Sequence, residues 1–199
     1  MATSKLPVYA MPKMQEYLRK NGPWSQLVDY KNISLRDLRH NVAVDLDDIV
    51  VTPILVPHRD EFSETKGYKI ASDAKVALFI PDINKWSVWE TDLADAIAEV
   101  DYALLDATFF GAGELPGRDM SKVPHPLVTE TMYVFKGLSA KQRKKGWFIH
   151  MNHTNPLLDS GSQQFKMVVS AGFNIAVEGI RLPLWLGLRV IFCKLNQCF

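Results

Sequence analysis

Four short apolar segments in this chain are each followed by a histidine or an aspartate. Short apolar runs bounded by Gly, Pro and polar residues are typical of buried β-strands. In layered α/β folds, functional side chains gather in the loops beyond the strand ends. The pattern therefore predicts four strands that bring ligand-forming side chains to one site. The segments are residues 50–57, 76–81, 102–105 and 147–149, followed by His58, Asp82, Asp106 and His150.

Helical segments alternate with these strands. Residues 89–100 have apolar side chains at helical spacing with acidic residues between them, which is typical of an amphipathic helix. Alternating strands and helices predict an α/β layered fold, and 199 residues suffice for one domain with a sizeable core. Further predicted helices cover residues 12–22, 129–135 and 162–171, and residues 173–176 and 179–182 are predicted to form a closing strand pair.

The last predicted strand leads into a polar turn, residues 150–156, that Pro156 ends. His150 and His153 lie three residues apart in this turn, and the whole chain has only five histidines. Histidine is the side chain best suited to metal binding or proton transfer near neutral pH. The turn is a candidate part of a site, although histidines that only hydrogen-bond to backbone would give the same pattern.

The residue types at the four strand ends suit a metal. Imidazole nitrogen and carboxylate oxygen together form a ligand set for zinc, manganese or iron. Such a metal lowers the pKa of bound water and polarises a phosphoryl or carbonyl oxygen. The alternative is four unrelated turn or cap residues, because an aspartate after a strand is often one of these.

Other polar groups carry weaker signals. His40 is interpreted as a surface residue, and the aspartates at 45, 47 and 48 as a solvated turn, since they lack the EF-hand spacing and glycine. The basic run at residues 141–145 is interpreted in the same way. The sequence contains no phosphate-binding G-x-x-x-x-G-K-[ST] loop, no G-x-G-x-x-G and no G-x-S-x-G elbow, so nucleotide-loop chemistry and a serine hydrolase are unsupported.

Net charge and cysteine content limit the classes of partner and the cellular compartment that the sequence supports. A net charge of +1 gives no electrostatic argument for nucleic acid or an anionic membrane. Cys193 and Cys198 are the only cysteines, so the body of the chain has no disulfide framework. Lysines and prolines interrupt the first thirteen residues, which therefore lack a signal-peptide core. We expect a cytoplasmic protein that acts on a small molecule, and the oligomeric state is open.

The C-terminal segment is unlike the rest of the chain. Residues 182–199 are strongly apolar, with Arg189 and Lys194 among them. The segment is too short and too interrupted for a membrane span, which needs roughly 20 mostly apolar residues. We interpret residues 183–199 as a tail foreign to the domain; a docked terminal helix and a weak anchor are the alternatives.

Taken together, the strand ends resemble the metallo-β-lactamase superfamily. The resemblance is strongest to its coenzyme PQQ biosynthesis protein B branch, with the tRNA 3′-processing ribonuclease and phosphodiesterase branches as neighbours. It extends from about residue 7 to residue 182. The residues that carry it are Val56-Pro57-His58-Arg59-Asp60-Glu61 with Gly67-Tyr68, Ile80-Pro81-Asp82, Leu104-Leu105-Asp106-Ala107-Thr108-Phe109, and His150-Met151-Asn152-His153-Thr154-Asn155-Pro156.

The resemblance implies an αββα sandwich and a role for each strand-end residue. It implies that His58 is a metal ligand, and that Asp82 is the carboxylate bridging two metals. His150 would be the last histidine ligand or a transition-state contact, and Asp106 an acid/base or supporting group. His125 and His153 lie where further polar contacts are expected. The catalytic candidates are thus Asp106, His150 and His153, and the metal-ligand candidates are His58, Asp82 and His150, with His125 as a further candidate.

One departure limits these expectations. The H-x-H-x-D-H motif that defines the superfamily's first metal position occurs nowhere in this sequence. We therefore expect an incomplete domain over residues 1–182, a partial sandwich, with zinc (or manganese or iron) bound weakly or not at all. A full-length parent would hydrolyse a phosphodiester or related ester with a metal-bound hydroxide, and this chain alone would be inactive.

Two other functions stay open. The chain could be a non-catalytic protein that binds a small ligand or a single metal, or it could have a biosynthetic or carrier role in coenzyme PQQ formation.

Overall fold

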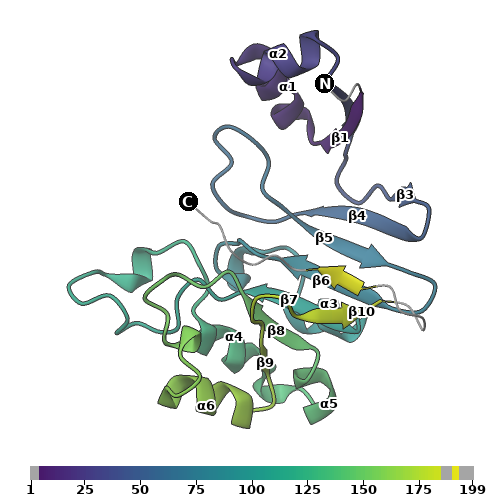
Figure 1. Cartoon of the computed structure of the whole chain (residues 1–199). Helices are drawn as coiled ribbons and strands as arrows, with labels where there is room; N and C mark the ends of the chain where they lie inside the picture. The colour runs from purple at the N-terminus through teal and green to yellow at the C-terminus, as the bar shows by residue number, and fades with distance from the viewer. Residues whose placement is uncertain (1–4, 185–189, 193–199) are drawn as a thin grey trace.

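A seven-stranded mixed sheet organises the chain in the computed structural model, which describes residues 5–184 and 190–192 (Figure 1). Its strand order is β3-β4-β5-β6-β7-β8-β9. Neighbours from β3 to β6 are antiparallel, and neighbours from β6 to β9 are parallel. The strands are β3 (Val44–Leu46), β4 (Ile49–Leu55), β5 (Lys66–Ala71), β6 (Val76–Ile80), β7 (Tyr102–Asp106), β8 (Gly146–Ile149) and β9 (Asn174–Ile175).

Strand direction explains why the predicted site residues meet. Strands β6, β7 and β8 are parallel, so their carboxyl ends lie at one edge of the sheet. Strand β4 is separated from β6 by two antiparallel steps, so it runs in the same direction as β6. The segments after β4, β6, β7 and β8 therefore all leave the sheet at the same edge.

The sheet has two apolar faces because side chains alternate along each strand. On one face, Leu78, Leu105 and Phe148 belong to the main core, where helices cover the sheet. On the other face, Leu104 and Ile149 form a smaller core. The helices are α3 (Leu93–Ala98), α4 (Val128–Val134), α5 (Ala140–Arg143) and α6 (Gln163–Ser170), with 3-10 turns η1 (Trp86–Val88), η2 (Met120–Lys122), η3 (Phe135–Gly137) and η4 (Pro156–Leu158).

The smaller core is covered by the last described part of the chain. Strand β10 (Arg181–Pro183) pairs with β11 (Val190–Phe192) in a separate two-stranded ladder. Leu182 and Leu184 pack against Leu104 and Ile149, and Leu184 is fully buried. Most of the segment predicted to be a foreign tail lies outside the described residues, so that assignment stays a prediction. Among residues 5–184 and 190–192, the structure contains no apolar helix with the length needed to span a bilayer.

A small N-terminal module precedes the sheet (Figure 1). Strand β1 (Leu6–Ala10) pairs in parallel with β2 (Ile33–Asp37), and helices α1 (Pro12–Lys20) and α2 (Trp24–Asp29) connect them. Proline at the first position of α1 suits a helix start, because its missing N–H would have no helical partner there. Lys13 in α1 forms an exposed ion pair with Asp60, in the loop between β4 and β5.

The predicted α/β layered fold is confirmed, and two details of the prediction are wrong. The helix expected over residues 89–100 is the shorter α3, because Asp92 caps it by accepting hydrogen bonds from the N–H groups of Ala94 and Asp95. The closing strand pair does not form. Strand β9 extends the large sheet beside β8, whereas β10 belongs to the separate ladder.

Candidate metal centre

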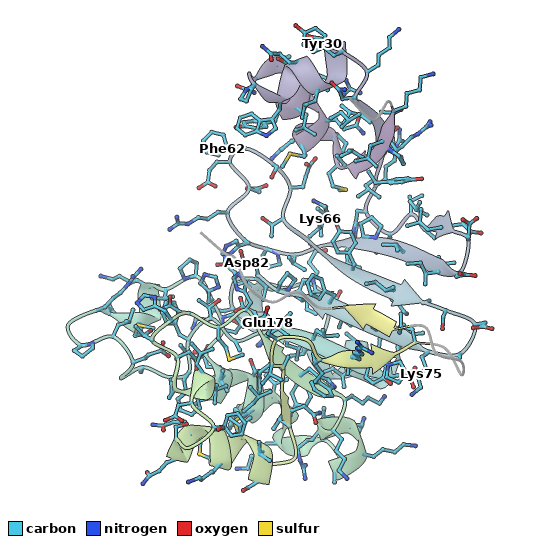
Figure 2. The ribbon with its side chains drawn as sticks, in the orientation of Figure 1. Tyr30, Phe62, Lys66, Lys75, Asp82 and Glu178 are labelled. Atoms are coloured by element: carbon cyan, nitrogen blue, oxygen red, sulfur yellow. The ribbon has the colours of Figure 1, made fainter. Side chains whose placement is uncertain are left out.

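The predicted site residues gather at the edge of the sheet where β4, β6, β7 and β8 end. Figure 2 shows Asp82 at this edge, beyond β6. Nε2 of His58 lies 3.1 Å from Oδ1 of Asp82, and His58 is only 11% exposed. Nδ1 of His150 lies 3.9 Å from Oδ1 of Asp106, the last residue of β7. The structure thus brings together His58, Asp82, Asp106 and His150, from segments up to 92 residues apart in sequence (150 − 58).

His125 joins this group from the long loop after β7. Its Nδ1 lies 2.9 Å from Oδ2 of Asp106 and 3.3 Å from Oδ1 of Asp82. A small apolar cluster holds the loop, and the Phe109 ring packs on the His125 ring at an interplanar angle of 73°, with 6.2 Å between centroids. The cluster consists of Phe109, Met120, Val123 and Leu127. His125 was only a secondary candidate in the sequence, yet it occupies the centre of the site.

The polar atoms around Asp82 have the properties of a cation site. Oδ1 of Asp82 and Nδ1 of His58 are both buried and have no hydrogen-bond partner among the described residues. Ligand atoms of His58, Asp82 and His125 all lie within 4.8 Å of one another. Buried polar atoms without partners are unfavourable unless something else satisfies them. Nitrogen and carboxylate donors at this spacing therefore fit a divalent transition metal.

Asp106 has a different environment. It is fully buried, and its oxygens accept hydrogen bonds from the N–H of Ile83 (3.1 Å), the N–H and hydroxyl of Thr108 (2.8 and 2.7 Å) and Nδ1 of His125 (2.9 Å). Burial would raise the pKa of the Asp106 carboxyl, but the donors around it, His125 first, hold that pKa below its ordinary value. Asp106 is therefore an ionised group whose acceptor capacity is used within the protein, and it orients the histidines.

His150 begins the turn after β8 in an uncommon backbone conformation. Its φ is +58°, in the left-handed region that non-glycine residues rarely adopt. The carboxylate of Asp106 raises the pKa of His150 above its ordinary value, against the opposing effect of burial. Nδ1 of His150 also lies 3.1 Å from the hydroxyl oxygen of Thr108. The turn thus directs the imidazole back toward the carboxyl end of β7.

Buried Asn155 fixes the turn that carries His150. Its side-chain amide donates to the carbonyl of Ala107 (2.7 Å), and its side-chain carbonyl accepts from the N–H of Leu157 (2.9 Å). The N–H of Asn152 donates to the carbonyl of Thr108 (3.0 Å). The bonds to the carbonyls of Ala107 and Thr108 join the loop after β8 to the loop after β7, so they hold His150 near Asp106.

One predicted residue lies apart from the others. His153 is exposed and belongs to neither of the two groups of ligand-forming side chains found among the described residues. His40 is also exposed, as predicted, and its Nδ1 accepts a hydrogen bond from the N–H of Leu55. Thr108 was not among the site residues predicted from the sequence, and the available signal was its position two residues after the strand-end aspartate Asp106.

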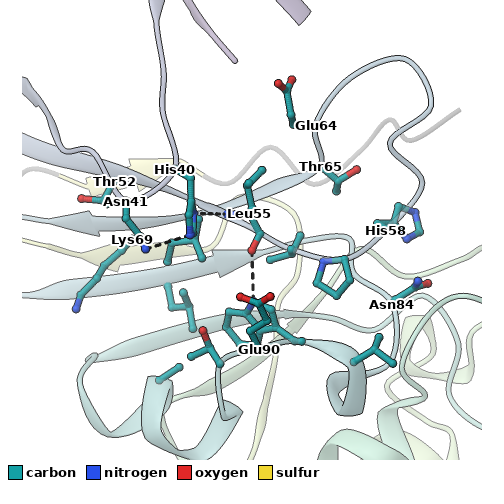
Figure 3. Close-up of a pocket in the computed structure, with 18 of the residues that line it drawn as sticks. His40, Asn41, Thr52, Leu55, His58, Glu64, Thr65, Lys69, Asn84 and Glu90 are labelled. Atoms are coloured by element: carbon teal, nitrogen blue, oxygen red, sulfur yellow. Dashed lines mark hydrogen bonds between the residues drawn. The ribbon is translucent and has the colours of Figure 1, made fainter. Parts of the chain in front are cut away.

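A large cavity adjoins the site on its His58 side (Figure 3). It has a volume of about 1250 Å³ and lies between β4, β5 and the segment from Val88 to Val100. His58 and Asn84 lie at one end, and Lys69 lies at the other. Lys69 pairs with Glu99 at 2.9 Å. Five carboxylate side chains line the cavity, which makes it a poor site for a polyanion: Asp60, Glu64, Glu90, Asp95 and Glu99.

Comparisons with known proteins agree with this geometry. The family model described as the beta-lactamase superfamily domain matches residues 1–151. Coenzyme PQQ synthesis protein B of Gluconobacter oxydans is 25% identical over 126 residues, covering 61% of this chain and 40% of that protein. The Ruegeria pomeroyi protein of the same name is 24% identical over 129 residues, covering 61% of this chain and 41% of its own length. The chain thus spans about two fifths of the length of these relatives.

Solved structures share the fold. The Zn²⁺-bound PqqB from Methylobacterium extorquens aligns with a TM-score of 0.69 at 21% identity, covering 90% of this chain and 65% of that one. A diphosphatase from the PhnP family aligns with a TM-score of 0.57 at 20% identity, covering 94% and 61%. The family match, together with the shared fold, leads to one conclusion: the chain belongs to the metallo-β-lactamase superfamily, and within it the chain is similar to coenzyme PQQ synthesis protein B.

Proposed function

We propose that this chain forms the metal-binding part of a metal-dependent hydrolase that cleaves an ester or phosphodiester bond. The observation that carries the proposal is the convergence of His58, Asp82 and His125 around two buried polar atoms without hydrogen-bond partners. These three residues would hold the metal, with His150 beside them. Zinc is the proposed metal, because two imidazoles and a carboxylate form one of the ligand sets that zinc uses at catalytic sites.

Each residue of the site has a defined task in this proposal. A bound zinc ion would supply Lewis acidity and activate water. Asp106 orients His125 through a 2.9 Å hydrogen bond, and the Thr108 hydroxyl lies between the Asp106 carboxylate and Nδ1 of His150. A neutral His150 would be a further imidazole ligand of the zinc. His153 is exposed and outside both groups of ligand-forming side chains among the described residues, so it has no part in holding the metal in this proposal.

The test is zinc content together with hydrolysis of bis(p-nitrophenyl) phosphate. For the chain alone we expect about one bound zinc, held by His58, Asp82 and His125, and no measurable turnover, because the sequence lacks the H-x-H-x-D-H motif that the family resemblance assigns to the first metal position. Asp82→Ala should lose the zinc. Purified protein without zinc, or with zinc that survives the Asp82→Ala substitution, would overturn the assignment of the site.

A second candidate function is favoured by the cavity. Its volume of about 1250 Å³ exceeds that of most small-ligand pockets, and His58 lines both the cavity and the metal site. A protein that binds a small ligand without catalysis would use the same surface. Zinc at one equivalent, ligand binding at the cavity and no hydrolysis by any form of the protein would favour this function.

The curated relatives suggest the ligand for that experiment. They are named as coenzyme PQQ synthesis proteins, so a biosynthetic or carrier role with a quinone-like molecule is part of the second candidate. The probe is pyrroloquinoline quinone, titrated into the zinc-loaded chain with tryptophan fluorescence as the signal, because Trp89 lines the cavity. Pyrroloquinoline quinone carries three carboxylates, which the acidic lining disfavours, so its binding should require the zinc beside His58 and should be lost in the zinc-free chain.

A further inference from the structure

The hydroxyl of Thr108 contacts three groups of the site at once. Its oxygen lies 2.7 Å from Oδ1 of Asp106, 3.1 Å from Nδ1 of His150 and 3.2 Å from Nδ1 of His125. A threonine hydroxyl has one proton to donate and two lone pairs that accept. If the hydroxyl donates this proton to Asp106, its oxygen can only accept hydrogen bonds from the two histidine nitrogens.

Asp106 receives that proton. Both of its oxygens already accept backbone N–H groups, Oδ1 from Thr108 and Oδ2 from Ile83. An ionised carboxylate is an acceptor only. The short contact between Oδ1 and the Thr108 hydroxyl is thus a bond in which the hydroxyl donates. The lone pairs of the hydroxyl oxygen remain available for the histidines.

The two histidines reach Asp106 by different routes. Nδ1 of His125 lies 2.9 Å from Oδ2 of Asp106 and donates to it directly. Nδ1 of His150 lies 3.9 Å from the nearest Asp106 oxygen, which is beyond hydrogen-bond distance. Its close partner is the Thr108 oxygen at 3.1 Å, and that oxygen can only accept from it. His150 is therefore connected to the carboxylate through the threonine.

We propose that Thr108 is a positioning residue that holds His150 in the form with its proton on Nδ1, so that Nε2 presents its lone pair for metal binding. The inference rests on the proposed metal-binding function and deepens it. Histidine ligands commonly donate their second ring N–H to a carboxylate, carbonyl or water, which fixes ring orientation and tautomer. Here the Thr108 hydroxyl links His150 to the Asp106 carboxylate, which already binds His125 directly.

The first test reads the tautomer in the metal-free protein. The 199-residue chain, labelled with ¹⁵N-histidine, is examined by long-range ¹H–¹⁵N NMR at alkaline pH, where the rings are neutral, and His150→Gln identifies the His150 signals. Wild type and Thr108→Ser should show a proton on Nδ1 of His150. Thr108→Val, which removes the hydroxyl and keeps the shape, should show a mixture of tautomers or a proton on Nε2.

The second test measures zinc affinity by competition with a chromophoric chelator. Thr108→Val should weaken binding by about 10-fold or more, the range found when groups that orient metal ligands are lost, and Thr108→Ser should restore it. Thr131→Val is the matched control. Thr131 is also a buried threonine, but its hydroxyl accepts from Trp86 (2.8 Å) and does not touch the site histidines.

The outcomes separate this inference from the proposed function. A Thr108→Val protein that keeps the wild-type His150 tautomer overturns the role of Thr108, whether or not zinc binds. A wild-type chain that binds no zinc overturns the proposed metal site. The role of Thr108 is still tested in that case, because the His150 tautomer is measured in the metal-free protein. Far-UV circular dichroism checks folding, and Thr108→Ala replaces Thr108→Val in both tests if the valine variant does not fold.

Discussion

Oδ1 of Asp82 lies 3.1 Å from Nε2 of His58, yet it accepts no hydrogen bond from that ring or from any other described group. The same oxygen lies 3.3 Å from Nδ1 of His125, again without hydrogen-bond geometry. Two imidazoles thus face one carboxylate oxygen at close range without bonding to it. This is the arrangement expected of groups that share a cation.

Removal of the Asp82 carboxylate should abolish stabilisation by zinc. A ligand that binds only the native state at 100 times its Kd adds about 2.7 kcal/mol to the free energy of unfolding. We expect zinc to raise the melting temperature of the wild type and to leave that of Asp82→Ala unchanged. Asp60→Ala, which loses only an exposed ion pair with Lys13, should behave as wild type. An equal response of wild type and Asp82→Ala would contradict the site.

His125 and His153 should differ in their effect on zinc binding. His125 is 15% exposed and lies among the carboxylates of the site, whereas His153 is exposed and outside it. His125→Ala should weaken zinc binding at least 10-fold, since it removes a ligand or its direct partner, and His153→Ala should leave affinity within about twofold. Isothermal titration of zinc into both variants measures the two affinities. A larger loss of affinity in His153→Ala than in His125→Ala would show that His153, and not His125, belongs to the metal site.

Asn155 should be a major contributor to stability. It is 2% exposed; its bond to the Ala107 carbonyl joins the turn after β8 to the segment after β7, and its bond from the N–H of Leu157 holds the turn itself. Asn155→Ala leaves the Ala107 carbonyl and the Leu157 N–H without these partners, which should lower the free energy of unfolding by about 1–3 kcal/mol. Urea unfolding measures the change. Asn152→Ala, which loses one exposed side-chain bond to Thr154, should change stability by about 0.5 kcal/mol or less.

Gly67 in β5 should not tolerate a larger side chain. A Cβ atom there would lie 2.7 Å from the carbonyl oxygen of Phe79 and 2.8 Å from Cγ1 of Ile80. The backbone of β6 cannot move away without disturbing the sheet, so Gly67→Ala should destabilise the protein by about 1–3 kcal/mol. Gly113→Ala has open space around the new methyl group and serves as the control. Equal melting temperatures for the two variants would be inconsistent with this packing.

The sequence predicted the strand ends well because the signal there is local. An apolar run such as residues 76–81 is specified by its own residues and by the proline and aspartate that end it. The helix that starts at Pro12 is also local, and it is confirmed as α1. The shorter α3 shows the limit of periodicity, because the Asp92 cap determines where the helix begins.

Long-range geometry was less predictable. No local pattern specifies that Asn174 pairs beside Trp147 rather than with the segment after Gly179. His125 lies in a loop of irregular composition, and long-range contacts return it to the sheet edge: the packing of Phe109 with Leu127 and the hydrogen bond to Asp106. The role of Thr108 depends on distances to three side chains from three segments, which no spacing in the sequence encodes.

Asp106 has a consequence for how the protein assembles. Its partners Ile83 and His125 lie 23 and 19 residues away in sequence, in different loops. These bonds can form only after β6 and β7 have paired and the loop that carries His125 has closed over them. A partly assembled chain therefore offers no finished site, so the free energy of metal binding stabilises only the completed fold. Zinc uptake at the proposed site would then report whether the fold is complete, and loss of zinc should precede unfolding whenever either loop opens.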